Sequence, residues 1–153
     1  MDDKIILLVE DNPDDEELTL RALKKNNITN EIVVMHDGQE ALDYLFGAGP
    51  FADRDARIQP QVILLDINMP KVNGLDVLAR LRADPRTSLL PVVMLTSSAE
   101  ERDLVAAYLN HANSYIRKPV DFDQFTHAVQ QLGLYWLVLN QPPPRPTPAP
   151  PAD

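Results

Sequence analysis

The chain contains no cysteine and no basic tract, and each absence removes a class of function. Without cysteine there is no disulfide, thiol nucleophile or thiolate metal site. The net charge of −9 argues against general binding of nucleic acid or an anionic membrane, because both depend on basic patches. The apolar run at 5–9 is too short for a signal peptide or a membrane span. We therefore expect a cytoplasmic protein.

What is present suits one globular domain. The chain has 153 residues, of which 44% are hydrophobic and 24% charged. Proline is concentrated at the end, where it fills seven of the ten positions from 142 to 151. Such a segment cannot form a helix or a sheet core. We predict one domain over 1–140 and a disordered, proline-rich tail over 141–153, with no output domain after it.

Five short apolar runs alternate with segments of helical periodicity. Strands are predicted at 5–9, 31–35, 62–65, 91–95 and 113–116. A helix is predicted after each strand, beginning near Pro13, Asp37, Asn73, Ser98 and Asp121. The segment 47–61 lacks periodicity and is interpreted as a long surface loop. Alternating hydrophobic strands and helices predict a doubly wound α/β fold, with a five-stranded parallel sheet covered by helices on both faces.

The apolar positions predict which helix faces are buried. The first helix offers Leu18, Ala22 and Leu23. The helix after Asn73 offers Leu75, Leu78, Ala79 and Leu81.

Polar residues follow four of the apolar runs. They are Glu10 with Asp11, then Asp66, Thr96 and Lys118. Because the carboxyl ends of parallel strands share one edge, we expect these side chains to gather there. Three clustered carboxylates favour a hard divalent cation such as Mg²⁺, and a lysine favours a phosphate. The set is typical of phosphoryl transfer to a carboxylate.

The neighbouring acids at 14–17 are interpreted differently. They stand at the start of the first helix, where negative charge complements the helix dipole. We predict a solvated acidic helix start there, with no site residue among them.

Four stretches together resemble a receiver domain of a two-component response regulator. They are V-E-D-N-P-D-D at 9–15, L-L-D-I-N-M-P-K-V-N-G at 64–74, M-L-T-S at 94–97 and Y-I-R-K-P at 115–119. The resemblance covers nearly the whole chain. It implies a flavodoxin-like fold with strand order 2-1-3-4-5.

The resemblance also implies the metal site. Asp66 would be the phosphoacceptor. Asp11, Asp66 and the backbone carbonyl of Asn68 would bind Mg²⁺, and Glu10 would contribute through water. Glu10 departs from the family, where aspartate is commoner, and this should change the metal geometry slightly. His111 stands where glycine is usual, with little expected cost.

The remaining implied roles concern the switch. Thr96 would donate a hydrogen bond to the phosphoryl group and Lys118 would pair with it. Tyr115 would turn inward when Thr96 moves. The Lys118–Pro119 peptide bond is expected to be cis.

The expected function is that of a single-domain response regulator, and not a turnover enzyme. It would take a phosphoryl group from a partner histidine kinase and change a surface made of the fourth helix, fifth strand and fifth helix. The loop at 47–61, D-F-D-Q-F at 121–125 and the segment 132–144 are similar to regulators of phytochrome kinases.

Two other classes of function are weighed against this one. A Mg²⁺-dependent phosphohydrolase usually has an acid two residues after its nucleophile, where this chain has Asn68. A binding module without phosphorylation would not need Asp11, Asp66, Thr96 and Lys118 together.

The run 134–139 is apolar all round, which a five-stranded domain does not explain. We expect it to pack against a second copy, forming a homodimer, or against a kinase, unless the loop or the tail covers it. The interface candidates are Tyr135, Trp136, Leu137 and Leu139.

Overall fold

The sheet has five parallel strands in the order β2-β1-β3-β4-β5. The computed structural model describes residues 5–25, 30–55, 58–97 and 114–131. The strands are β1 (Ile5–Val9), β2 (Glu31–Met35), β3 (Val62–Asp66), β4 (Val92–Thr96) and β5 (Ser114–Arg117). The predicted fold class and strand order are confirmed. The predicted limits of the fourth strand, 91–95, lie one residue too early, and so does the predicted end of the fifth strand at 116; its predicted start at 113 lies outside the described residues.

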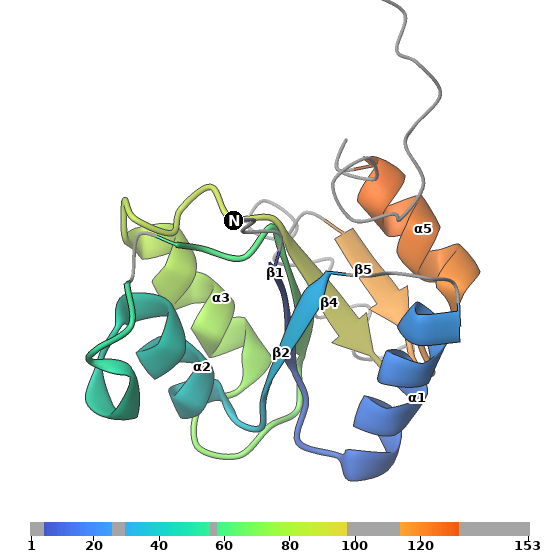
Figure 1. Cartoon of the computed structure of the whole chain (residues 1–153), viewed down its shortest axis with the longest axis horizontal. Helices are drawn as coiled ribbons and strands as arrows, with labels where there is room; N and C mark the ends of the chain where they lie inside the picture. Colours follow the sequence, from blue (N-terminus) through green and yellow to red (C-terminus); the bar gives the residue numbers. More distant parts are fainter. Residues whose placement is uncertain (1–4, 26–29, 56–57, 98–113, 132–153) are drawn as a thin grey trace, which may run out of the picture.

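Helices cover both faces of this sheet (Figure 1). The described helices are α1 (Pro13–Lys25), α2 (Gly38–Phe46), the short 3-10 helix η1 (Gly49–Phe51), α3 (Gly74–Ala83) and α5 (Phe122–Gln131). In Figure 1, α2 and α3 lie on one side of the sheet, and α1 and α5 lie on the other. The helix predicted from Ser98, His111, and the chain after 131 lie outside the described residues.

The core consists of two layers separated by the sheet. Successive strand residues face opposite sides, so Leu7 and Leu65 pack with α2 and α3, whereas Leu8 and Leu64 pack with α1 and α5. All four are fully buried. Burial of one such side chain stabilises the fold by about 1.5–3 kcal/mol. The strands are therefore apolar on both faces, which is why their sequences run hydrophobic without alternation.

The predicted buried face of α1 is partly wrong. Leu18 is 43% exposed, whereas Thr19 and Leu23 are 1% and 0% exposed. Thr19 and Leu23 are four residues apart and so share one face of the helix. The sheet and α5 pack against this face, and Leu18 lies beside it. Hydrophobicity alone favours Leu18 over Thr19 for the buried face.

The predicted face of α3 is also partly wrong. Ala79 is exposed, whereas Val77 is fully buried beside Leu78 and Leu81. Val77, Leu78 and Leu81 pack in one buried cluster with α2 and the sheet, and this packing selects the rotation of the helix. At its first residue, the Gly74 N–H donates to the carbonyl of Ile67 at 2.8 Å. This bond ties the start of α3 to the end of β3.

The described part of the loop at 47–61 is held against α2. The Arg54 guanidinium donates to the backbone carbonyl oxygen of Tyr44 at 2.7 Å, and its Cζ lies 3.8 Å from the centre of the Tyr44 ring. Phe51, in η1, packs edge-on against the same ring at 5.4 Å. The loop therefore covers α2, on the side of the molecule away from α1 and α5.

Candidate functional site

The carboxyl ends of β1, β3 and β4 meet at one edge of the sheet. The order of the strands reverses between β1 and β3, and ligands of open α/β sheets bind at such a switch point. Glu10 follows β1, and Asp66 and Thr96 end β3 and β4. The sheet thus brings together residues that are more than 80 positions apart in the sequence.

Three carboxylates cluster at this edge. Glu10, Asp11 and Asp66 each offer an oxygen, and these oxygens all lie within 4.8 Å of one another. Glu10 is fully buried and Asp66 is 3% exposed, whereas Asp11 faces solvent. The Glu10 N–H donates to the carbonyl of Met35 at 2.9 Å, which extends the sheet by one position. Glu10 is therefore held at the edge by the backbone of β2.

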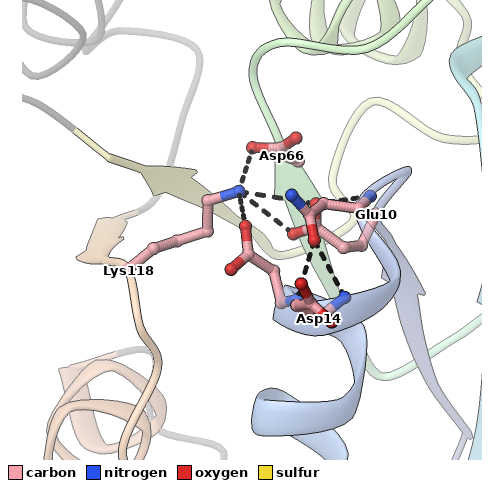
Figure 2. A network of polar contacts seen from close by, with 6 residues as sticks. Glu10, Asp14, Asp66 and Lys118 are labelled. Carbon is pink, nitrogen blue, oxygen red and sulfur yellow. Dashed lines mark hydrogen bonds and ion pairs between the residues drawn. The ribbon is translucent and has the colours of Figure 1, made fainter.

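Lys118 joins the cluster from the end of β5 (Figure 2). Its Nζ lies 3.1 Å from Asp66 Oδ1, 3.3 Å from Glu10 Oε1 and 2.8 Å from Asp15 Oδ2. The lysine side chain is only 10% exposed. One nearly buried ammonium therefore pairs with three carboxylates.

The charges of the site shift two pKa values. Burial raises the pKa of Glu10 to about 7, with repulsion from Asp66 adding to the rise and Lys118 opposing it. Burial by itself would lower the pKa of Lys118. The hydrogen bond with Asp15 and the charges of Asp66 and Glu10 outweigh burial and raise the pKa of Lys118 above its usual value. The site thus carries more negative charge than its lysine balances.

Asp15 is a residue of this site that the sequence analysis missed. It was assigned, with its acidic neighbours, to a solvated helix start, and this assignment is wrong for Asp15. Its carboxylate makes the shortest contact to Lys118, at 2.8 Å, and its side chain is 27% exposed. The available signal was the spacing, because Asp15, Thr19 and Leu23 recur at every fourth position and lie on one helix face.

The predicted switch residues take different positions. Thr96 is fully buried, and its Oγ1 has no hydrogen-bond partner within the described ranges. Its carbonyl oxygen accepts from the Lys118 N–H at 2.6 Å, which links β4 to the lysine. Tyr115 is 41% exposed on β5, and the Lys118–Pro119 peptide bond is cis.

Asn68, two residues after the candidate phosphoacceptor, lies in the β3–α3 loop and is exposed. The predicted interface residues of 134–139 lie outside the described part of the chain. None of the helices within that part is both long and apolar enough to cross a membrane.

The oxygen cluster fits a hard divalent cation. Mg²⁺ is usually bound by one or two carboxylates together with water and phosphate oxygens. Asp11 is exposed enough to admit such an ion, and Asp66 belongs to the same cluster. A cation would also offset the repulsion from Asp66, which adds to the effect of burial in raising the pKa of Glu10. The carboxylates of Asp11, Asp66 and Glu10 could therefore hold the ion.

Comparison with known proteins identifies the family. The model of the response regulator receiver domain matches residues 6–130. The chain belongs to the response regulator receiver family. Members of this family act as regulators and not as turnover enzymes.

Three relatives are especially similar. The structure of the bacteriophytochrome response regulator AtBRR is 51% identical with a TM-score of 0.83, over 90% of this chain and 98% of that one. The bacteriophytochrome response regulator RtBRR is 52% identical with a TM-score of 0.82, over 92% and 84%. Response regulator Rcp1 of Synechocystis sp. is 37% identical over 88% of this chain and 89% of its own length. A structure of Rcp1 was solved in a Mn²⁺-bound form, and its TM-score to this chain is 0.69. The chain is thus a receiver related to phytochrome response regulators.

Proposed function

We propose that Asp66 is the acceptor of a phosphoryl group delivered by a partner histidine kinase. The observation that carries the proposal is the Lys118 ammonium, 3.1 Å from the Asp66 carboxylate and at the edge of an oxygen cluster suited to a divalent cation. The similarity to AtBRR and RtBRR supports a kinase of the phytochrome type.

The transfer follows from the positions of the charged groups. One Asp66 oxygen attacks the phosphorus of a phosphohistidine. The new O–P bond forms as the N–P bond breaks, and the electron pair of that bond returns to the imidazole nitrogen of the kinase. Asp11, Asp66, the Asn68 carbonyl and, through water, Glu10 would hold Mg²⁺, which would neutralise part of the charge on the phosphoryl oxygens. Lys118 pairs with one of these oxygens.

The phosphoryl group also acts as the signal. The Thr96 hydroxyl is buried and lacks a partner among the described residues, and such a group is costly at about 1–3 kcal/mol. The hydroxyl would donate a hydrogen bond to a phosphoryl oxygen, which would draw Thr96 toward Asp66. Tyr115, now exposed, would turn inward and change the surface of the fourth helix, β5 and α5. Phosphorylation thereby biases an existing two-state equilibrium.

Intact-mass measurement tests the phosphoacceptor directly. The wild type, incubated with Mg²⁺ and a small phosphodonor, should gain one phosphoryl group, and Asp66→Asn should gain none. Asp76→Asn, which changes an acid on α3 away from the oxygen cluster, is the matched control and should behave like the wild type. A wild type without an adduct, or an equal adduct on Asp66→Asn, would contradict the proposal.

A further inference from the structure

The three carboxylates around Lys118 differ in what else they do. Glu10 and Asp66 also belong to the oxygen cluster suited to a cation, and Asp66 is the proposed phosphoacceptor. Asp15 is not a member of that cluster within the described residues. Its contact with Lys118 is nevertheless the shortest of the three, at 2.8 Å. Asp15 is therefore the contact of Lys118 that neither the cation nor the phosphoryl group would use.

The start of α1 holds Asp15 toward the site. Asn12 caps the helix, because its Oδ1 accepts from the N–H groups of Asp14 at 2.8 Å and Asp15 at 3.1 Å. Thr19 and Leu23, one and two turns later on the same face, are buried against the sheet. Side chains on a helix lean toward its N-terminus, and here the N-terminus meets the carboxyl end of β1. The buried face of α1 thus aims the carboxylate at the strand ends.

We infer that Asp15 is a positioning residue. It keeps the Lys118 ammonium in place while Glu10 and Asp66 interact with the cation and the phosphoryl group. The inference rests on the proposed function of Asp66. A lysine ammonium has three N–H donors on a flexible four-carbon stem. One donor stays on Asp15, and the others are free to turn from the carboxylates to the phosphoryl oxygens. Without Asp15, the remaining ion pairs of Lys118 among the described residues are with Glu10 and Asp66, which change partners during the proposed reaction.

The first test measures Lys118 itself in the presence of Mg²⁺ and without a phosphodonor. Low-extent reductive methylation, mapped by peptide mass, reports how well the ammonium is held. Lys118 of the wild type should be protected, and in Asp15→Asn it should react several-fold faster. Asp14→Asn makes the same charge change at the adjacent, exposed position and should keep the protection of the wild type.

The second test measures phosphorylation over a range of donor and Mg²⁺ concentrations. Asp15→Asn should lower the maximal rate about tenfold, the effect of losing one charge-assisted hydrogen bond. The Mg²⁺ concentration that gives half the maximal rate should not change, because Asp15 is not a proposed ligand. Asp15→Glu, which keeps the charge on a longer stem, should recover part of the rate, and Asp14→Asn should retain all of it. Thermal unfolding confirms that each variant is folded.

The outcomes separate this inference from the proposed function. If the wild type gains no phosphoryl group, the proposed function fails, while the methylation of Lys118 still decides whether Asp15 holds it. Equal behaviour of Asp15→Asn and Asp14→Asn in either test overturns the inference. A higher Mg²⁺ requirement in Asp15→Asn also overturns it, because Asp15 would then act on the cation.

Discussion

At the scale of single residues, Lys118 governs the charge balance of the site. Its ammonium lies within 3.3 Å of three different carboxylates while only 10% of the side chain is exposed. The pKa of Glu10 is raised in spite of this lysine, because burial and Asp66 both disfavour its charge. Stability and metal binding should therefore be linked through Lys118.

Replacing Lys118 with alanine should destabilise the protein by about 3–5 kcal/mol, because buried carboxylates lose their counter-charge. Mg²⁺ should restore part of this loss, since an ion that binds only the folded state stabilises it. Urea unfolding with and without Mg²⁺ measures both effects.

Lys71→Ala provides the control for that experiment. Lys71 is 67% exposed in its ion pair with Asp37, so its replacement should cost less than about 1 kcal/mol. Equal unfolding midpoints for Lys118→Ala and the wild type without Mg²⁺ would contradict the assigned charge balance.

At the scale of the elements, the connection between β3 and α3 positions Asp66. Asn73 caps α3, because its side chain accepts from the Asp76 N–H at 2.9 Å. Gly74 follows and packs directly on the end of β3. A Cβ atom at Gly74 would lie 2.1 Å from the carbonyl oxygen of Asp66, a distance that requires the backbone to move. Glycine is needed here for close approach, which lets α3 begin against Asp66, the proposed phosphoacceptor.

Gly74→Ala should therefore destabilise the protein by about 1–3 kcal/mol and slow the phosphorylation of Asp66. Gly38→Ala is the comparison, because a Cβ at Gly38 would lie 1.8 Å from the carbonyl oxygen of Val72 and not against Asp66. It should destabilise similarly, with a smaller effect on phosphorylation. Urea unfolding and the phosphorylation rate together distinguish the two, and an unchanged rate in Gly74→Ala would refute the positioning role.

At the scale of the whole molecule, most large hydrophobic side chains of the described residues are buried against one another. Two buried layers flank the sheet, and the large exposed hydrophobic residues within it are scattered singly, for example Leu18 and Leu89. Single exposed residues of this kind are normal in monomers. An apolar contact between copies should therefore involve the sequence run 134–139, which follows the described part of α5.

Light scattering should accordingly show that the wild type self-associates. Trp136→Ala should raise the dissociation constant of the dimer at least about tenfold, as expected for loss of a buried aromatic side chain at an interface. Leu89 is 92% exposed and far from the run 134–139 in the sequence, so Leu89→Ala serves as the control and should leave association unchanged. A strictly monomeric wild type, with or without phosphorylation, would contradict the predicted homodimer.

Much of the fold and part of the site followed from the sequence alone. Strands buried on both faces must be continuously apolar, so their positions were visible as short runs ended by polar residues. Parallel strands end at one edge, so the pattern of apolar runs was sufficient to place Asp66, Glu10 and Lys118 together. The order of the strands came from the resemblance to receivers, and the sheet has that order.

Only the tertiary structure decided how the helices are rotated. The segments that pack against α1 select the face that it buries, so Thr19 is buried and Leu18 is exposed. Asp15 lies on the same face as Thr19 and contacts Lys118. In α3, packing against α2 and the sheet buries Val77, whereas Ala79 is exposed. Hydrophobic periodicity in a short helix is compatible with several rotations, and contacts between distant segments select one of them. The sequence therefore determined which strand ends carry the clustered polar residues, and the packing of α1 determined that a further carboxylate joins them.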